Sequence, residues 1–214
     1  MSTPNSPPTT LEEYTAYYDL GTLQFPITTT NSESQTWFNY GWTWCIAFNH
    51  EEGVICFQNA LAADPDCVMA YWGVAYAKGP NYNIPWEALL GPGYDPLVSE
   101  ITNAVSEAEK RLDGVTDVEK ALVNALKSRY PKEQMDKKDF KIWNGEYASA
   151  MESVYEDFKD DLNVVTLYTE SLMNLNPWNL WNLKTGTPTD GAECVLLFLC
   201  PFRPISSAIL KHVS

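Results

Sequence analysis

The chain has few histidines and few basic residues. Its 214 residues include only two histidines, His50 and His212, and 14 lysines and arginines stand against 28 aspartates and glutamates, which gives a net charge of -14. Nucleic acids and anionic membrane surfaces repel such a protein, so we expect neither as a partner. Two imidazoles are also too few for a histidine-rich metal site, and we expect no metal or other cofactor.

The sequence motifs of several large enzyme classes are missing. The chain contains no G-x-S-x-G, no G-x-x-x-x-G-K-[ST] and no G-x-G-x-x-G, which are signatures of hydrolases, nucleotide binders and dinucleotide binders. Val54 stands at the position where a zinc-protease helix that began at His50 would carry its second histidine. These absences favour a protein that is not an enzyme.

Signals for export or membrane insertion are missing as well. The stretch "MSTPNSPPTTLEEY" has neither the basic nor the apolar region of a secretory signal, and the five cysteines show no C-x-x-C spacing. Reduced thiols in the cytoplasm are the simplest account of an odd number of cysteines. The apolar run from Cys194 to Cys200 is far shorter than the roughly 20 residues that span a bilayer, so we expect no membrane span.

Aromatic residues recur at helical spacing, which predicts an all-α protein. The stretch "SESQ" from Ser32 offers a capping box, and Trp37, Tyr40, Trp44 and Phe48 follow at intervals of three or four residues. Further helical patterns follow along the chain, and no alternation of apolar and polar residues is long enough to demand a strand. We therefore predict stacked antiparallel helix hairpins with a core supplied by a 45% hydrophobic composition.

Three segments differ in composition. Residues 1–31 are rich in Pro, Ser and Thr, so we predict a poorly structured leader, followed by a helical domain over residues 32–183. Residues 184–214 form an atypical tail, whose part after Glu193 has neither a helical cap nor a repeat register. We interpret this tail as a non-native ending of a truncated sequence. A short hydrophobic docking tail is the alternative.

One unit of the chain matches a known helical repeat. Over residues 34–67, eight positions fall in the register of the tetratricopeptide pattern, namely Trp37, Tyr40, Gly41, Trp44, Gly53, Phe57, Ala60 and Pro65. This unit resembles the tetratricopeptide repeat, with Tyr40 in place of Leu and Gly53 in place of Ala. We predict that two helices approach closely at Gly41 and Gly53, while Trp44 and Phe57 fill the surrounding space. The resemblance implies a short right-handed α-α superhelix.

A longer stretch carries a narrower resemblance. "FNHEEGVICFQNALAADPDCVMAYWGVAYAKGPNYN" is similar to a family of microbial and fungal tetratricopeptide-domain proteins that share an F-N-H-E-E-A turn and a G-P-N-x-N loop. The resemblance covers residues 20–183, and Gly53 replaces the alanine of the turn. It implies that relatives continue past "NPWNLW" into further helices that carry several histidines.

These features favour a non-enzymatic scaffold that binds a peptide or protein partner in a concave groove. The inner helices of a solenoid line such a groove, and aromatic anchors with neighbouring amides suit peptide recognition. Packing of a long loop is the alternative reading of the same side chains. The predicted partner-binding residues are Tyr71, Trp72, Asn81, Tyr82, Asn83 and Trp86.

The rival hypothesis is a metal-dependent biosynthetic enzyme. In that case His50 would donate one ligand and a missing C-terminal region would supply the others. As a structural residue, His50 would instead cap the preceding helix or form a hydrogen bond across the turn. Cys45 and Cys56 lie at helix positions that point towards packing, so a cysteine nucleophile has no support from their placement.

Overall fold

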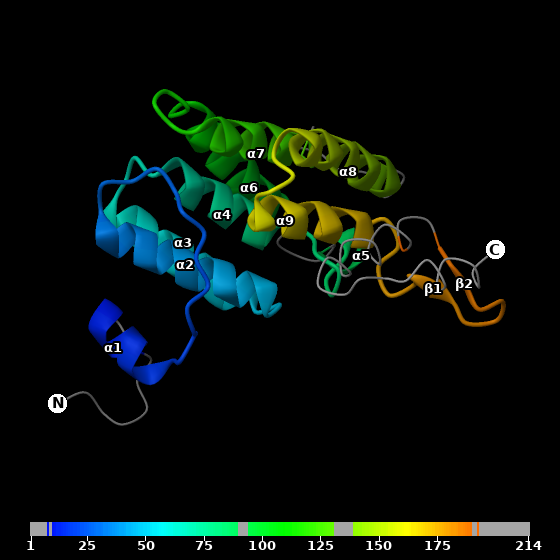
Figure 1. The fold of residues 1–214 in the computed structure, drawn as a ribbon, viewed down its shortest axis with the longest axis horizontal. Coiled ribbons are helices and arrows are strands. Elements are labelled where there is room, and N and C mark those ends of the chain that lie inside the picture. The colour runs from blue at the N-terminus through cyan, green and yellow to red at the C-terminus, as the bar shows by residue number, and fades with distance from the viewer. Residues whose placement is uncertain (1–7, 9, 90–93, 131–138, 190–191, 193–214) are drawn as a thin grey trace. The chain divides into compact units, whose positions relative to one another are not determined.

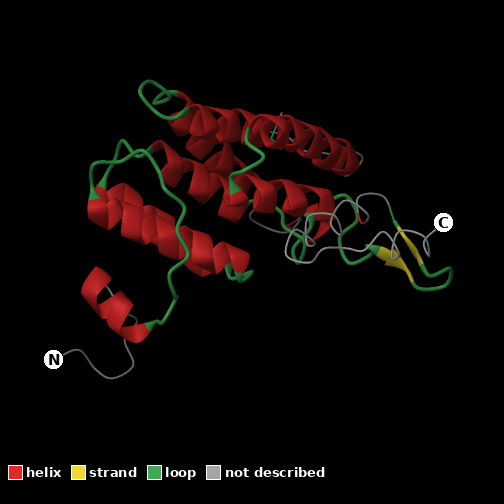
Figure 2. Cartoon of the chain, viewed as in Figure 1, coloured by secondary structure: helices red, strands yellow, loops and turns green. Residues whose placement is uncertain are grey.

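The computed structural model describes residues 8, 10–89, 94–130, 139–189 and 192 (Figure 1). These residues are mostly helical, with one short pair of strands among them (Figure 2). The predicted all-α fold of packed neighbouring helices is confirmed. Residues 194–214, on which the interpretation of a non-native ending rests, lie outside the described residues.

The chain divides into two compact units, where the sequence predicted a single helical domain over residues 32–183. Unit 1 consists of Met1–Lys78 and Asn103–Glu119, and in it α3 packs against both α2 and α4. Short turns join these three helices, as predicted for helix hairpins. Its complete helices are α1 (Leu11–Tyr17), α2 (Ser32–Ile46), α3 (His50–Ala63) and α4 (Val68–Lys78).

Unit 2 consists of Gly79–Thr102 and Lys120–Ser214, and in it α8 packs against α9. Two boundaries between the units fall within helices, one in α6 (Tyr94–Glu109) and one in α7 (Asp117–Ser128). The strands pair antiparallel and have two residues each, which is too short for an alternating pattern to reveal. The remaining elements are α5 (Trp86–Leu89), α8 (Phe140–Asp157), α9 (Leu162–Met173), β1 (Trp181–Asn182) and β2 (Thr187–Pro188).

Side-chain caps fix where several helices begin. Asn31 caps α2, because its Oδ1 accepts hydrogen bonds from the backbone N–H groups of Glu33 and Ser34. The cap predicted from "SESQ" therefore lies one residue too late. At α7, Thr116 and Glu119 bond to each other's backbone N–H groups, as a capping box does.

Two glycines bring α2 and α3 into close contact, as the repeat register predicted. A Cβ atom on Gly41 would lie 2.7 Å from Cε1 of Phe57, and a Cβ atom on Gly53 would lie 2.8 Å from Sγ of Cys45. Phe57 is fully buried, and its ring also lies against Gly73 of α4, where a Cβ atom would approach to 2.6 Å. The ring is thus held between α2 and α4.

The predicted aromatic face of α2 is only partly correct. Trp37 is buried as expected, but Trp44 is only partly buried. Phe48 is 43% exposed because α2 ends at Ile46 and the chain turns at Phe48 with a φ of 60°. The buried residues towards α3 and α4 are instead Phe38 and Trp42.

The N-terminal leader contains more structure than predicted. Thr10 and Glu13 form a capping box that starts α1, and Tyr14 of this helix is buried. Further along, Phe25 is only 2% exposed. The prediction of a poorly structured segment is therefore wrong for residues 10–31, because two aromatic side chains attach this segment to the helices of unit 1.

Replacing Gly41 with alanine is expected to destabilise the protein, because the fully buried Phe57 ring has no space to move away from the new methyl group. The expected loss is about 1–3 kcal/mol of unfolding free energy, measured by urea denaturation. Gly145→Ala in α8 is the matched control, since a Cβ atom there meets nothing within 4 Å. This variant should gain roughly 0.5–1 kcal/mol from helix propensity. Equal effects of the two substitutions would contradict the close contact.

Candidate functional site

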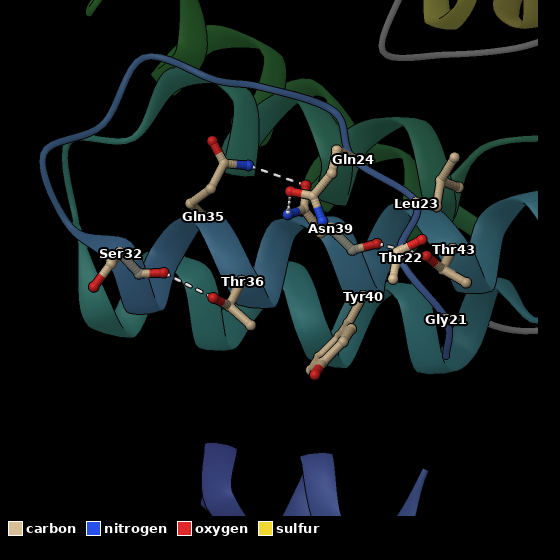
Figure 3. Close-up of a pocket in the computed structure, with 10 residues that line it drawn as sticks. All are labelled: Gly21, Thr22, Leu23, Gln24, Ser32, Gln35, Thr36, Asn39, Tyr40 and Thr43. Carbon is tan, nitrogen blue, oxygen red and sulfur yellow. Dashed lines mark hydrogen bonds between the residues drawn. The ribbon is translucent and has the colours of Figure 1, made fainter. Parts of the chain in front are cut away.

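An extended segment of unit 1, residues 22–29, runs along α2 and is called the strap here (Figure 3). Its one fully buried side chain is Phe25. The Phe25 ring lies edge-on to three aromatic rings, with centroid distances of 5.5 Å to Phe38, 5.3 Å to Trp42 and 6.3 Å to Trp72. An aromatic pocket on α2 and α4 thus holds the strap.

Two amide side chains of α2, Gln35 and Asn39, bind the strap backbone and are called the amide pair. The Phe25 N–H donates to Asn39 Oδ1 at 3.0 Å, and the Ile27 N–H donates to Gln35 Oε1 at 3.0 Å. Gln35 Nε2 donates to the Phe25 carbonyl at 2.9 Å. Residues four apart lie on the same face of a helix, so the two amides follow the strap in register.

The end of the strap is fixed by carboxylates. Glu119 is buried and accepts hydrogen bonds from the backbone N–H of Thr28 at 2.6 Å and from its hydroxyl at 2.5 Å. The Thr29 hydroxyl donates to Asp64 Oδ2 at 2.5 Å. Hydrogen bonds to charged groups are stronger than those between neutral groups, so this end is the firmer one.

A pocket of about 350 Å³ opens where the other end of the strap meets α2 (Figure 3). The lining side chains are uncharged and most of them carry hydroxyl or amide groups. Within the described part of the chain, the backbone N–H groups of Thr22, Leu23 and Gln24 donate no hydrogen bond. The lining residues are Gly21, Thr22, Leu23, Gln24, Ser32, Gln35, Thr36, Asn39, Tyr40 and Thr43.

Of the residues at this site, the sequence pattern predicted only Tyr40, as a repeat position. A signal was present, because Gln35 and Asn39 lie one turn apart on a helix that follows a proline-containing extended segment. Side-chain amides that bind a distant backbone leave no periodic pattern in that backbone, however. The periodic pattern therefore predicts helix α2 but not the strap that binds to it.

Two of the predicted partner-binding residues belong to hydrophobic cores. Trp72 is 1% exposed and stacks on Tyr76, with ring centroids 5.0 Å apart. Trp86 is also 1% exposed, stacks on Phe140 at 5.4 Å and donates its indole N–H to Asn144 Oδ1. Burial removes both indoles from the surface, so their assignment as partner contacts is corrected to packing.

The other four predicted contacts are also divided between the two units. Tyr71 is in unit 1, half-buried beneath the Arg111 guanidinium at 4.8 Å. In unit 2, Asn81 is buried, and its Oδ1 accepts hydrogen bonds from the N–H groups of Asn83 and Ile84. Tyr82 lies half-buried against Trp178, whereas Asn83 is exposed. Neither unit contains the whole predicted set.

His50 is the first residue of α3 and is largely buried. Its ring lies 6.2 Å from Phe48 and 6.3 Å from Tyr76, while the cap of α3 is Asn49. Among the residues that the structure describes, no three His, Cys, Asp or Glu side chains gather in a way that would hold a metal ion. Over the same residues, no helix has the length and apolar character needed to cross a membrane.

Tyr14 of α1 is the centre of a buried hydrogen-bond network. Its hydroxyl accepts hydrogen bonds from the Trp44 indole at 2.5 Å and from the Cys56 thiol at 3.3 Å, and it donates to Glu52 at 3.5 Å. Burial raises the pKa of Cys56 to about 12, although the bond with Tyr14 acts in the opposite direction. The thiol is therefore protonated at neutral pH and is a poor nucleophile.

Unit 2 contains a second polar cluster. The Arg129 guanidinium lies 4.6 Å from the ring centroid of Tyr147 and is fully buried. Asn174 Nδ2 donates to Glu170 Oε1 at 2.5 Å. Burial raises the pKa of the Glu170 carboxyl, while the charge of Arg129 and the bond from Asn174 act in the opposite direction. The carboxyl thus lies in a poorly solvated place, close to the charge of Arg129 and bonded to Asn174.

Comparison of the chain with protein-family models, with curated proteins and with solved structures found no match. The resemblance of residues 20–183 to tetratricopeptide proteins therefore stays a prediction. The candidate site is defined by the strap, the amide pair and the pocket.

Replacing Tyr14 with phenylalanine tests the first network. The change removes one hydroxyl and leaves the Trp44 and Cys56 donors without their acceptor. We expect a loss of about 1–2 kcal/mol of unfolding free energy, measured by urea denaturation. Tyr17→Phe is the matched control on the same helix, because Tyr17 is 70% exposed, and it should change little. A similar loss in both variants would contradict the role of Tyr14.

Replacing Glu170 with glutamine tests the second cluster. Because its pKa is raised in the folded state, Glu170 favours folding when protonated, and this contribution is lost as the pH rises through the folded pKa. Wild-type stability should therefore fall relative to Glu170→Gln as the pH rises above about 4.5, measured by urea denaturation at a series of pH values. The exposed Glu152→Gln in α8 is the control. A stability difference that stays constant over this range would contradict the raised pKa.

Proposed function

We propose that the protein is a non-enzymatic scaffold of tetratricopeptide type that binds an extended segment of a partner protein in the pocket beside α2. The observation that carries this proposal is the open pocket of about 350 Å³, lined by uncharged hydrogen-bonding side chains and by the strap backbone. A volume of this size is within the range of small-ligand sites. It admits a few residues of an extended chain.

The chemistry of the lining suits a peptide backbone. A backbone offers alternating N–H donors and C=O acceptors, and hydroxyl and amide groups satisfy both. The N–H groups of Thr22, Leu23 and Gln24 donate no hydrogen bond within the described residues, so backbone donors are available at the pocket for main-chain bonds to an extended segment. Recognition of this kind depends on main-chain hydrogen bonds, whereas side chains of the partner provide specificity.

The strap itself supports the proposal, because it shows that α2 holds an extended chain. Three hydrogen bonds between the strap and the amide pair, two donated by the N–H groups of Phe25 and Ile27 and one accepted by the Phe25 carbonyl, are of the kind that a bound peptide would form. The net charge of -14 favours encounter with a basic partner segment at low ionic strength. The raised pKa of Cys56 argues against this thiol as a nucleophile.

The test blocks the pocket without disturbing the core. Thr36 lines the pocket, and its hydroxyl donates only to the carbonyl of Ser32 in its own helix, so Thr36→Arg places a long side chain in the pocket entrance. Peptides are selected from a random display library on the wild-type chain, and their affinities for the variants are then measured. Binding should weaken by about tenfold or more in Thr36→Arg, as expected when a site is sterically filled.

Thr166→Arg is the matched control. Thr166 is an exposed threonine of α9 whose hydroxyl makes the same bond to the carbonyl four residues earlier, at Leu162. The selected peptides should bind this variant with wild-type affinity. If no peptide is enriched on the wild-type chain, or if both arginine variants bind equally well, the pocket is not the binding site.

A further inference from the structure

The strap lies on α2 in the way that a peptide ligand would. Its backbone bonds are made to side chains of another element, because Phe25 and Ile27 donate to Asn39 and Gln35. Gln24 adds a side-chain contact, since its Oε1 accepts from Asn39 Nδ2 at 2.8 Å. No strap residue within the described chain belongs to a helix or strand.

Inward-facing and exposed residues alternate along the strap, as they do in a bound extended chain. Phe25 faces the helices and is buried, Pro26 is exposed, and Ile27 again donates its N–H to α2. Proline has no N–H to satisfy and it favours extended backbone, so it suits the outward position. The sequence Phe-Pro-Ile thus combines one aromatic anchor with two backbone donors spaced two residues apart.

We propose that the strap is an internal ligand, and that a partner segment with the same pattern, an aromatic residue followed by proline and a β-branched residue, displaces it from the amide pair. This inference rests on the proposed function, because the pocket is the open continuation of the strap groove. It names the class of partner, an extended Phe-Pro-β-branched segment. It also explains why the groove of the free protein is occupied.

The attachment of the strap to the chain at both ends limits which partner segments can displace it. A tethered segment competes at a high effective concentration, so a free peptide must bind tightly or be present in excess to replace it. The bonds of Thr28 to Glu119 and of Thr29 to Asp64 hold the end next to α2. The opposite end borders the open pocket at Thr22 and Leu23. Displacement therefore begins at the pocket and proceeds towards Phe25.

The experiment weakens the strap and supplies it again as a separate peptide. Phe25→Ala in the full chain removes the aromatic anchor and leaves the space among the rings of Phe38, Trp42 and Trp72 empty. A fluorescein-labelled peptide of residues 19–29, DLGTLQFPITT, is then titrated with each chain and followed by fluorescence anisotropy. The peptide should bind the Phe25→Ala chain about tenfold or more tightly than it binds the wild type.

Two controls keep the result interpretable. The same peptide with alanine at the phenylalanine position should not bind Phe25→Ala, because it lacks the anchor. If Phe25→Ala loses its helical circular dichroism, Phe25→Leu replaces it in the experiment, because leucine keeps most of the apolar volume. Since the leucine still partly fills the groove, Phe25→Leu should bind the peptide more weakly than a chain whose groove is empty. Absence of peptide binding to the folded variant, or equal binding to the wild type, would overturn the proposal.

The outcomes also separate this inference from the proposed function. If library peptides bind the wild-type pocket while the strap peptide fails on Phe25→Ala, only the internal-ligand proposal is wrong. If the strap peptide binds Phe25→Ala while no library peptide binds the wild type, the groove accepts an extended segment but the open pocket does not. That second result would support the strap as an internal ligand, but it would contradict the proposed function and with it the displacement of the strap by a partner segment.

Discussion

The Phe57 ring lies against the bare backbone of α2 at Gly41 and of α4 at Gly73. Because neither helix has a side chain at the contact, the ring fixes the distance of α3 from both neighbours. The same spacing places Phe38, Trp42 and Trp72 around one position, which Phe25 of the strap then fills. The candidate site of unit 1 therefore depends on two glycines and one ring.

The side chains of α2 that bind the strap backbone are polar, unlike the contact around Phe57. The amide pair binds the backbone of the strap at Phe25 and Ile27, and the strap forms no helix or strand within the described residues. A buried aromatic anchor and a polar backbone clamp are the two components that peptide recognition requires. Their presence on a segment of the same chain connects the packing of unit 1 with its proposed binding role.

Residue spacing predicted the features that arise within or between neighbouring helices. The close approach at Gly41 and Gly53 followed from the repeat register. Contacts with distant segments could not be predicted in this way. Trp44 was assigned to the helix contact, but Tyr14 lies thirty residues earlier and accepts its indole hydrogen bond.

The candidate site is formed largely by contacts between residues far apart in sequence, so residue spacing predicted even less of it. Aromatic residues with neighbouring amides suggested that Trp86 contacts a partner, yet the indole is buried because it packs on Phe140 and bonds to Asn144 of α8. The strap resembled an unstructured leader because proline and threonine have no helical period. Its order comes from the amide pair and from Glu119, which is ninety-one residues away from Thr28 in sequence.

Hydrogen exchange of the wild-type chain, resolved residue by residue by NMR, tests the separability of the strap most directly. If the strap is an internal ligand, the amides of Phe25 and Ile27 are protected but exchange through a local opening that costs less free energy than global unfolding. Amides in the middle of α3, around Phe57, should exchange only through global unfolding. Equal opening free energies for the strap and for α3 would show that the strap leaves its groove only when unit 1 unfolds, and would contradict the account.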